Sequence, residues 1–303
     1  MFEVFYHPIY TYGIDKSSRF PRERYQLTRK YLENKTSNII FKKPNMINIK
    51  DIYLTHDKKF VDSFFKGSLT IKEKRKIGLQ PWNKHITNRT RYILGGSIEA
   101  MQSAVTKHNI AGNMAGGTHH AHYSFGSGYC IFNDIAICAV KSLRDYDKIN
   151  NVLIIDLDVH QGDGTASILK NYQNTFTFSM HCEKNFPLIK MKSDIDVPLP
   201  GGIKDDDYLE ILINNIDILR NIKFDLILFQ AGVDILINDS LGYLDISREG
   251  IKKRNEIILK FAKEKKVPMV VFMGGGYSKP IEHSVKAFSD LFLQCSHYSK
   301  FFI

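Results

Sequence analysis

The chain has 303 residues, of which 43% are hydrophobic and 24% charged, so its composition is that of an ordinary globular protein. Lysine and arginine outnumber aspartate and glutamate by 42 to 32, but no recognisable nucleic-acid-binding motif accompanies the scattered basic residues. Specific nucleic-acid binding is therefore disfavoured. No apolar stretch approaches the roughly 18 residues of a membrane span, and the four cysteines form no CxxC pair. We expect a cytoplasmic protein with reduced thiols.

Short apolar, β-branched runs alternate with segments of helical periodicity along the chain. In chain order the pattern predicts a polar surface loop at 72–82, a helix at 90–107, a strand at 110–115, a helix at 134–144, strands at 152–155 and 175–180, a helix at 205–219, a strand at 226–229, a helix at 248–263, a strand at 267–272 and a helix at 281–293. No linker divides the chain, so one domain over 1–303 is the simplest organisation. The alternation predicts an α/β fold, with a largely parallel sheet in a three-layer α/β/α arrangement.

Polar and glycine residues follow these strands at the positions where ligands bind in such folds, beyond the carboxyl ends of the strands. The segments are Gly116 to His120, Asp156 to His160, His181, Gln230 to Asp234 and Gly274 to Tyr277. Because parallel strands end at the same edge of a sheet, we expect these segments to meet at one rim.

The segment Asp156-Leu157-Asp158-Val159-His160 predicts part of a metal site. Strand alternation places its two carboxylates and its imidazole on one side. Such ligands suit Zn²⁺, and a catalytic zinc site uses three protein ligands, so a third is expected from another strand, with Asp234 the best placed. An isolated triplet would be better interpreted as turn or capping residues. Here the context reverses that interpretation, because these groups would be costly to bury without a metal or an equivalent network.

Proton transfer is the chemistry that the adjacent His119 and His120 suggest, with Asp156 and Asp163 available to fix their tautomers. Tyr277, after three glycines, could bring a hydroxyl to a developing oxyanion. Other histidines, His122 among them, have no partner at ligand spacing and are interpreted as structural or surface residues. No GxSxG elbow, phosphate loop or dinucleotide fingerprint is present, which excludes those classes of chemistry.

With these motifs in this order, the sequence resembles the histone deacetylase family and its bacterial relatives, including the acetoin-utilisation and acetylpolyamine amidohydrolase proteins, which share an arginase-like fold. The resemblance runs from about Phe5 to about Val285 and looks most like the compact class IV-like branch. The motifs that carry it are Gly116 to Ala121, Ser127 to Asp134, Asp156 to Gly164, Asn185 to Pro187, Ser193 to Pro200, Gln230 to Asp234 and Gly274 to Tyr277.

The resemblance implies a zinc-dependent hydrolase that removes acetyl or longer acyl groups from N-acyl-lysine or a related N-acyl amine. It implies the following roles: Asp158, His160 and Asp234 bind zinc, His119 and His120 transfer protons backed by Asp156 and Asp163, Tyr277 polarises the acyl carbonyl, and Gly128, Tyr129 and Phe186 form the substrate channel. Many relatives also hold a structural potassium ion on this strand with Ser179 and Met180, so K⁺ is a further expected cofactor.

One departure from the best-known eukaryotic members bears on the substrate. Around Gly78 to Trp82 no acidic residue matches the rim aspartate that grips a peptide backbone in those enzymes, which weakens a histone-like substrate and keeps small-molecule deacetylases in view. A dimanganese ureohydrolase would need a second set of carboxylate ligands. A non-catalytic acyl-lysine binder would have no need of the histidine pair.

Overall fold

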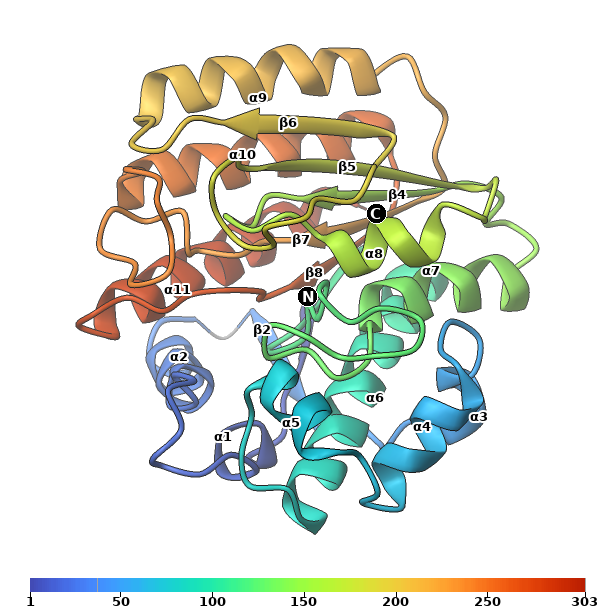
Figure 1. The fold of residues 1–303 in the computed structure, drawn as a ribbon. Helices are drawn as coiled ribbons and strands as arrows, with labels where there is room; N and C mark the ends of the chain where they lie inside the picture. The colour runs from blue at the N-terminus through green and yellow to red at the C-terminus, as the bar shows by residue number, and fades with distance from the viewer. Residues whose placement is uncertain (37, 303) are drawn as a thin grey trace.

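The computed structural model describes residues 1–36 and 38–302, and an eight-stranded sheet runs through it (Figure 1). The strand order is β2-β1-β3-β8-β7-β4-β5-β6, and every neighbouring pair is parallel, which confirms the predicted α/β class. The strands are β1 (Phe2–Phe5), β2 (Ile39–Lys42), β3 (Ile110–Asn113), β4 (Val152–Asp156), β5 (Thr175–Cys182), β6 (Ile195–Leu199), β7 (Leu226–Gln230) and β8 (Met269–Phe272).

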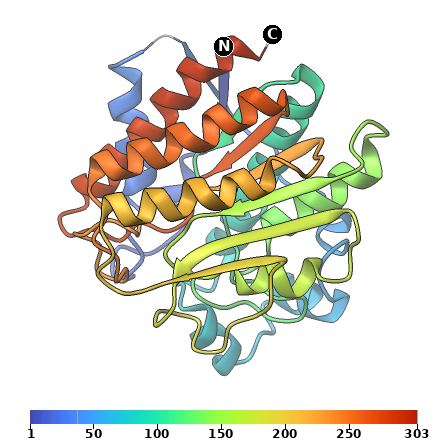
Figure 2. The same cartoon turned by 90° about the horizontal axis from the view of Figure 1, so that it is seen from above.

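Helices cover both faces of the sheet, so the fold has three layers (Figures 1 and 2). One face carries α2, α11, α10 and α9 in a row, and the other carries α6, α7 and α8. The helices are α1 (Ile9–Tyr12), α2 (Arg24–Glu33), α3 (Ile49–Ile52), α4 (Lys58–Phe65), α5 (Ile71–Ile77), α6 (Lys84–Lys107), α7 (Asp134–Asp145), α8 (Asp163–Leu169), α9 (Asp205–Leu219), α10 (Arg248–Lys265) and α11 (Glu282–Tyr298). No helix among the described residues is long and apolar enough to cross a membrane.

The central strands are buried along their whole length, because helices lie on both sides of them. Every residue of β3, β4, β7 and β8 is buried. This explains why these strands read in the sequence as continuous apolar runs rather than as an alternating pattern. The polar residues that interrupt those runs stand at the strand ends.

The predicted loop at 72–82 is wrong over its first half, where the structure has helix α5. A capping box between Thr70 and Glu73 begins this helix, and Gly78, in the left-handed conformation at φ 78°, ends it. Only Ile77 of the helix is buried, so the segment has no apolar stripe that would predict a helix. Local capping, and not burial, defines this element.

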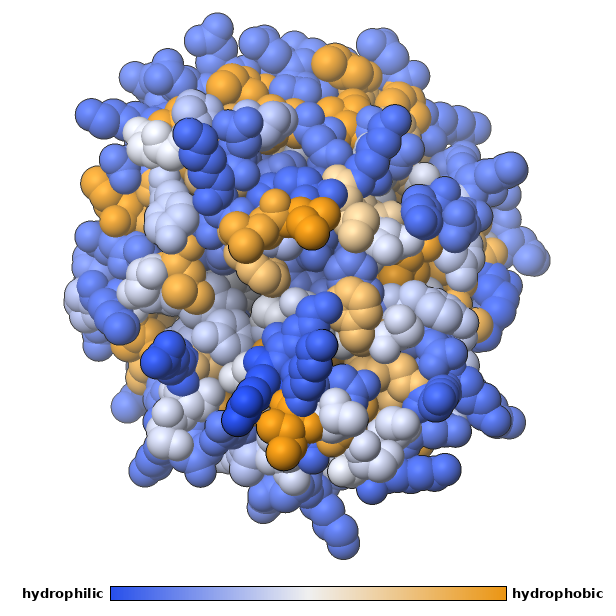
Figure 3. Space-filling view, viewed as in Figure 1, coloured by the Kyte–Doolittle hydropathy of each residue, from blue (hydrophilic) through white to orange (hydrophobic). Residues whose placement is uncertain are grey.

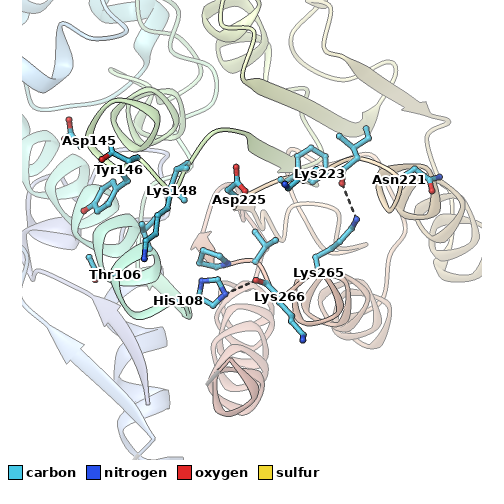
Figure 4. A pocket seen from close by; sticks show the side chains of 17 residues that line it. Thr106, His108, Asp145, Tyr146, Lys148, Asn221, Lys223, Asp225, Lys265 and Lys266 are labelled. Carbon is cyan, nitrogen blue, oxygen red and sulfur yellow. Dashed lines mark hydrogen bonds between the residues drawn. The ribbon is translucent and has the colours of Figure 1, made fainter.

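A cavity of about 880 Å³ opens at the amino ends of β3, β4, β7 and β8 (Figure 4). Charged side chains of both signs line it, including Lys148, Lys223, Asp225 and Lys266. The strands are parallel, so this cavity lies at the opposite edge of the sheet from the polar strand ends that the sequence singled out. It takes no part in the site described below.

Close packing at Gly95 in α6 gives a test of the fold. A Cβ atom there would stand 3.0 Å from the carbonyl carbon of Asn45 and 3.1 Å from the backbone nitrogen of Ile47, and backbone cannot move aside cheaply. We expect Gly95→Ala to lower the free energy of unfolding by about 1–3 kcal/mol in urea denaturation. Gly201→Ala is the control, since its Cβ would only touch Tyr243 at 3.5 Å. Equal stability of the two variants would contradict this packing.

Candidate active site

The segments that the sequence placed at one rim do meet there. Strands β3, β8, β7 and β4 are consecutive neighbours in the sheet, and the chain that follows each of them carries polar residues to the same edge. Those residues are His119 and His120 after β3, Tyr277 after β8, Asp234 after β7, and Asp158 and His160 after β4. All but Tyr277 are buried.

Asp158, His160 and Asp234 form a compact group suited to a cation. One candidate ligand atom from each lies within 4.8 Å of the others. His160 Nδ1 is 3.1 Å from a carboxylate oxygen of Asp158 and 3.2 Å from Asp234 Oδ2. Asp234 Oδ2 is buried without a hydrogen-bond partner, although a buried carboxylate oxygen normally requires one. Oxygen and nitrogen donors in this number match a zinc site with three protein ligands.

Electrostatics in this group also favour a bound cation. Burial, together with the neighbouring charge of Asp158, raises the pKa of Asp234 to about 7 in the protein chain alone. Two carboxylates that share one buried site repel each other, and a divalent cation relieves that repulsion.

Glycines allow the backbone to approach these carboxylates closely. The backbone N–H of Gly275 donates to Asp158 Oδ2 at 2.7 Å, and that of Val159 donates to Asp234 Oδ1 at 2.9 Å. A Cβ atom on Gly275 would overlap the Asp234 carboxylate, and one on Gly232 would overlap that of Asp158. The site therefore depends on glycine at both positions.

His119 and His120 lie beside this group, each held by its own carboxylate. Their ring centroids are 4.0 Å apart. His119 Nδ1 is 2.7 Å from Asp156 Oδ2, and His120 Nδ1 is 2.7 Å from Asp163 Oδ1. A carboxylate at Nδ1 fixes the proton on that nitrogen and leaves Nε2 free for chemistry. The predicted pairing of these histidines with Asp156 and Asp163 is thus present in the geometry.

The environments of the two histidines push their pKa values apart. Burial would lower the pKa of His119, but the charges of Asp156 and Asp158 outweigh it and raise the value to about 9. Burial and the charge of His119 lower the pKa of His120 to about 3. In the protein chain alone, neutral pH therefore leaves His119 charged and His120 neutral, a division suited to acid–base work.

Tyr277 is positioned by the backbone around it. Its N–H donates to Asp239 Oδ2 at 2.6 Å, and its carbonyl accepts from the N–H of Ser240 at 3.3 Å. Burial raises the pKa of the phenol well above its ordinary value, so the hydroxyl remains a hydrogen-bond donor.

A channel leads from the surface to these groups through a cavity of about 380 Å³ lined by Gly128, Tyr129, Phe186, His120 and Tyr277. The rings of His120 and Phe186 are 4.8 Å apart. Gly128 has a φ of +52°, and a Cβ there would be 2.7 Å from the His120 ring. Exposed apolar residues, Leu188 and Ile189, follow Phe186, and Figure 3 shows apolar side chains gathered near the middle of this face among hydrophilic ones.

Some residues of the site were missed in the sequence. His122, interpreted there as structural or surface, is buried, and its Nε2 lies 2.9 Å from the second oxygen of Asp163. Its position two residues after His120 was the available signal. Asp239 and Arg24 carried no signal: Asp239 follows the strand ends by several residues, and Arg24 lies on α2, far away in sequence.

Comparison with known proteins agrees with this geometry. The family model described as the histone deacetylase domain matches residues 18–291. The chain belongs to the histone deacetylase family. An uncharacterized protein of Picosynechococcus sp. is 40% identical over 287 residues, which cover 94% of this chain and 95% of that protein.

Named members of the histone deacetylase family are more distant. Histone deacetylase 2 of Arabidopsis thaliana is 32% identical over 250 residues, 76% of this chain and 61% of that protein. The acetoin utilization protein AcuC of Staphylococcus aureus is 26% identical over 315 residues, 96% of this chain and 80% of its own length. The resemblance and the fold expected from sequence are confirmed, and the chain is a hydrolase of the deacetylase type.

Proposed function

We propose that this protein is a zinc-dependent amidohydrolase that removes acetyl or longer acyl groups from N-acyl-lysine side chains or related N-acyl amines. The observation that carries the proposal is the buried group Asp158, His160 and Asp234 beside the His119–His120 pair, with Tyr277 lining the same cavity. Membership of the histone deacetylase family supports the same chemistry.

Asp158, His160 and Asp234 are the residues that would hold the zinc, because they combine buried oxygen and nitrogen donors with an oxygen that lacks a partner. When bound, zinc polarises the acyl carbonyl and lowers the pKa of water. A dimanganese ureohydrolase would require a second set of ligands, whereas residues 1–36 and 38–302 contain a single group of three. A structural K⁺ at Ser179 and Met180, a cytoplasmic location and a single domain over 1–303 stay predictions.

The protein's own groups divide the reaction among them. Tyr129 and Phe186 enclose the aliphatic part of the substrate, and the Gly128 carbonyl accepts the amide N–H. His120 is neutral, and its Nε2 carries no proton. This nitrogen takes a proton from the attacking water and returns one to the leaving nitrogen, and the C–N bond breaks without a covalent enzyme intermediate.

Two further groups act on charge that develops during the reaction. The hydroxyl of Tyr277 donates to the oxygen of the acyl carbonyl as that oxygen becomes negative. His119, whose Nδ1 pairs with Asp156, lies beside the same centre and supplies positive charge there when it is protonated.

The mouth of the channel bears on the choice of substrate. Among the described residues that line it, none is acidic, and Lys76 is the charged side chain at its edge. A cationic polyamine would find no carboxylate to pair with at this mouth, whereas a neutral acyl-lysine stem fits between Tyr129 and Phe186. The mouth therefore favours acyl-lysine over acetylpolyamine. A pure acyl-lysine binder is disfavoured because it would have no use for two carboxylate-paired histidines.

Removal of either proposed catalytic group tests the mechanism. We expect Tyr277→Phe to lower kcat on an acetyl-lysine peptide by about 10²–10³, and His120→Ala by about 10²–10⁴. Both changes should leave close to one zinc per chain, since neither side chain belongs to the ligand group. The measurement is steady-state kinetics beside metal analysis.

Tyr12→Phe is the matched control for these kinetics, because Tyr12 is exposed and lies outside the site. It should turn over like the unmodified protein. Full activity in both Tyr277→Phe and His120→Ala would defeat the mechanism.

Zinc content tests the ligand assignment separately from activity. We expect one zinc per chain in the unmodified protein, and its loss in Asp158→Ala and in Asp234→Ala, because two ligands do not retain the ion as three do. Asp163→Asn removes a buried carboxylate that lies outside the ligand group and should keep its zinc. Two metal ions per chain, or equal zinc in all of these variants, would contradict the assignment.

A further inference from the structure

Beyond the reaction centre the site continues into a small cavity of about 40 Å³. His119, His120, Asp158, His160 and Tyr277 line one part of it. The rest of the lining includes Phe20, Arg24, Tyr25 and Arg89, which come earlier in the sequence. An acyl group whose carbonyl lies at Tyr277 would therefore have two guanidinium groups within the same enclosed space.

Both arginines are buried, and their hydrogen bonds are incomplete. Arg24 is 2% exposed and donates to the carbonyl of Gly276 at 3.0 Å and to Tyr25 Oη at 3.3 Å. Arg89 is 5% exposed and donates to the carbonyl of Tyr10 at 2.9 Å and to the same Tyr25 Oη at 3.3 Å. The Nε of Arg24 is buried without an acceptor. A guanidinium carries five N–H donors, so each has donors to spare.

The positive charge of these two groups is not matched by local negative charge. Among the described residues neither guanidinium forms an ion pair with a carboxylate. Aromatic rings lie around them instead: the Arg24 guanidinium carbon is 4.9 Å from the centroid of Phe20 and 5.1 Å from that of Tyr25, and that of Arg89 is 5.5 Å from Phe20.

Such aromatic contacts offset only part of the cost of burial. The face of a ring attracts the positive charge but offers no acceptor for the N–H donors of the guanidinium, so the Nε of Arg24 stays without a hydrogen bond. Asp234, the carboxylate whose charge is felt at Arg24, belongs to the proposed zinc ligands. Two positive charges buried without a paired carboxylate therefore favour a ligand that brings a negative charge into the cavity.

We propose that the protein removes from lysine short acyl groups that end in a carboxylate, namely malonyl or succinyl. Arg24 and Arg89 bind that terminal carboxylate. This substrate class rests on the proposed amidohydrolase function. A carboxylate offers two oxygens to the forked donors of arginine, and the small volume of the cavity, about 40 Å³, limits the acyl chain to a few atoms.

The reaction is the same amide hydrolysis and needs no further reactant. Water supplies the oxygen that bonds to the acyl carbon, the bond from that carbon to the lysine nitrogen breaks, and the nitrogen receives a proton. The products are the free dicarboxylate and the lysine amine.

The test uses one peptide with its lysine modified in three ways: succinyl, succinamoyl and acetyl. Succinamoyl replaces the terminal carboxylate by a neutral amide of the same shape. We expect kcat/KM for the succinyl peptide to exceed that for the succinamoyl peptide about ten- to a hundredfold, as for a hydrogen bond to a charged group. The malonyl peptide and its neutral amide should show the same order. Equal rates for each charged peptide and its amide would overturn the inference.

Arg89→Gln adds a second arm to this test. It should lower the ratio of succinyl to acetyl turnover at least tenfold, because it removes one guanidinium from the cavity while keeping a polar side chain. Arg91→Gln is the matched control, since Arg91 lies on the same helix and outside the cavity lining. An unchanged ratio in Arg89→Gln would contradict the assignment.

Cleavage assays and binding calorimetry together distinguish failure of this inference from failure of the proposed function. Cleavage of the acetyl peptide with no preference for the charged acyl groups would leave the function standing and remove the inference. If no peptide is cleaved, the function fails, and binding of free succinate and of succinamide, its neutral diamide, to the unmodified zinc-loaded protein decides the inference by itself. Tighter binding of succinate, reduced in Arg89→Gln, supports it. Equal binding of the two overturns it.

Discussion

The buried carboxylate of Asp158 is the constraint around which the site is arranged. Its oxygens receive the N–H groups of His160 and Gly275, lie beside the His160 ring, and leave no space for a Cβ at Gly232. A charge held this deeply requires a positive partner. The proposed zinc supplies it, and the glycines let three strand ends bring their backbone to one point.

The parallel sheet explains how distant parts of the sequence reach that point. Strands β3, β8, β7 and β4 lie side by side, so their carboxyl ends deliver the histidine pair, the tyrosine and the ligand group to a single edge. Buried charges of both signs meet in the site. Carboxylates hold the two histidines and belong to the proposed metal group, and the arginines of α2 and α6 line the same cavity as those histidines.

Sequence was informative where burial leaves a clear pattern. The helix at 205–219 matches α9 residue for residue, and Asp156 to His160 indicated the ligand group because polar residues there interrupt an apolar strand. The sequence was not informative where local capping or packing between distant segments determines the structure. The helix α5 has only one buried residue, and the contact of His122 with Asp163, like the placement of Arg24 and Arg89, exists only after folding. Packing between α2, α6 and the rim leaves no trace in local periodicity.

X-ray absorption spectroscopy at the zinc edge of the zinc-loaded protein is the most direct measurement of the central claim, because it reports the atoms around the ion independently of activity. The account predicts nitrogen and oxygen neighbours at about 2.0–2.1 Å, with the scattering of one imidazole from His160. A sulfur neighbour at about 2.3 Å, as from Cys130, or two imidazoles bound to the ion, would contradict it.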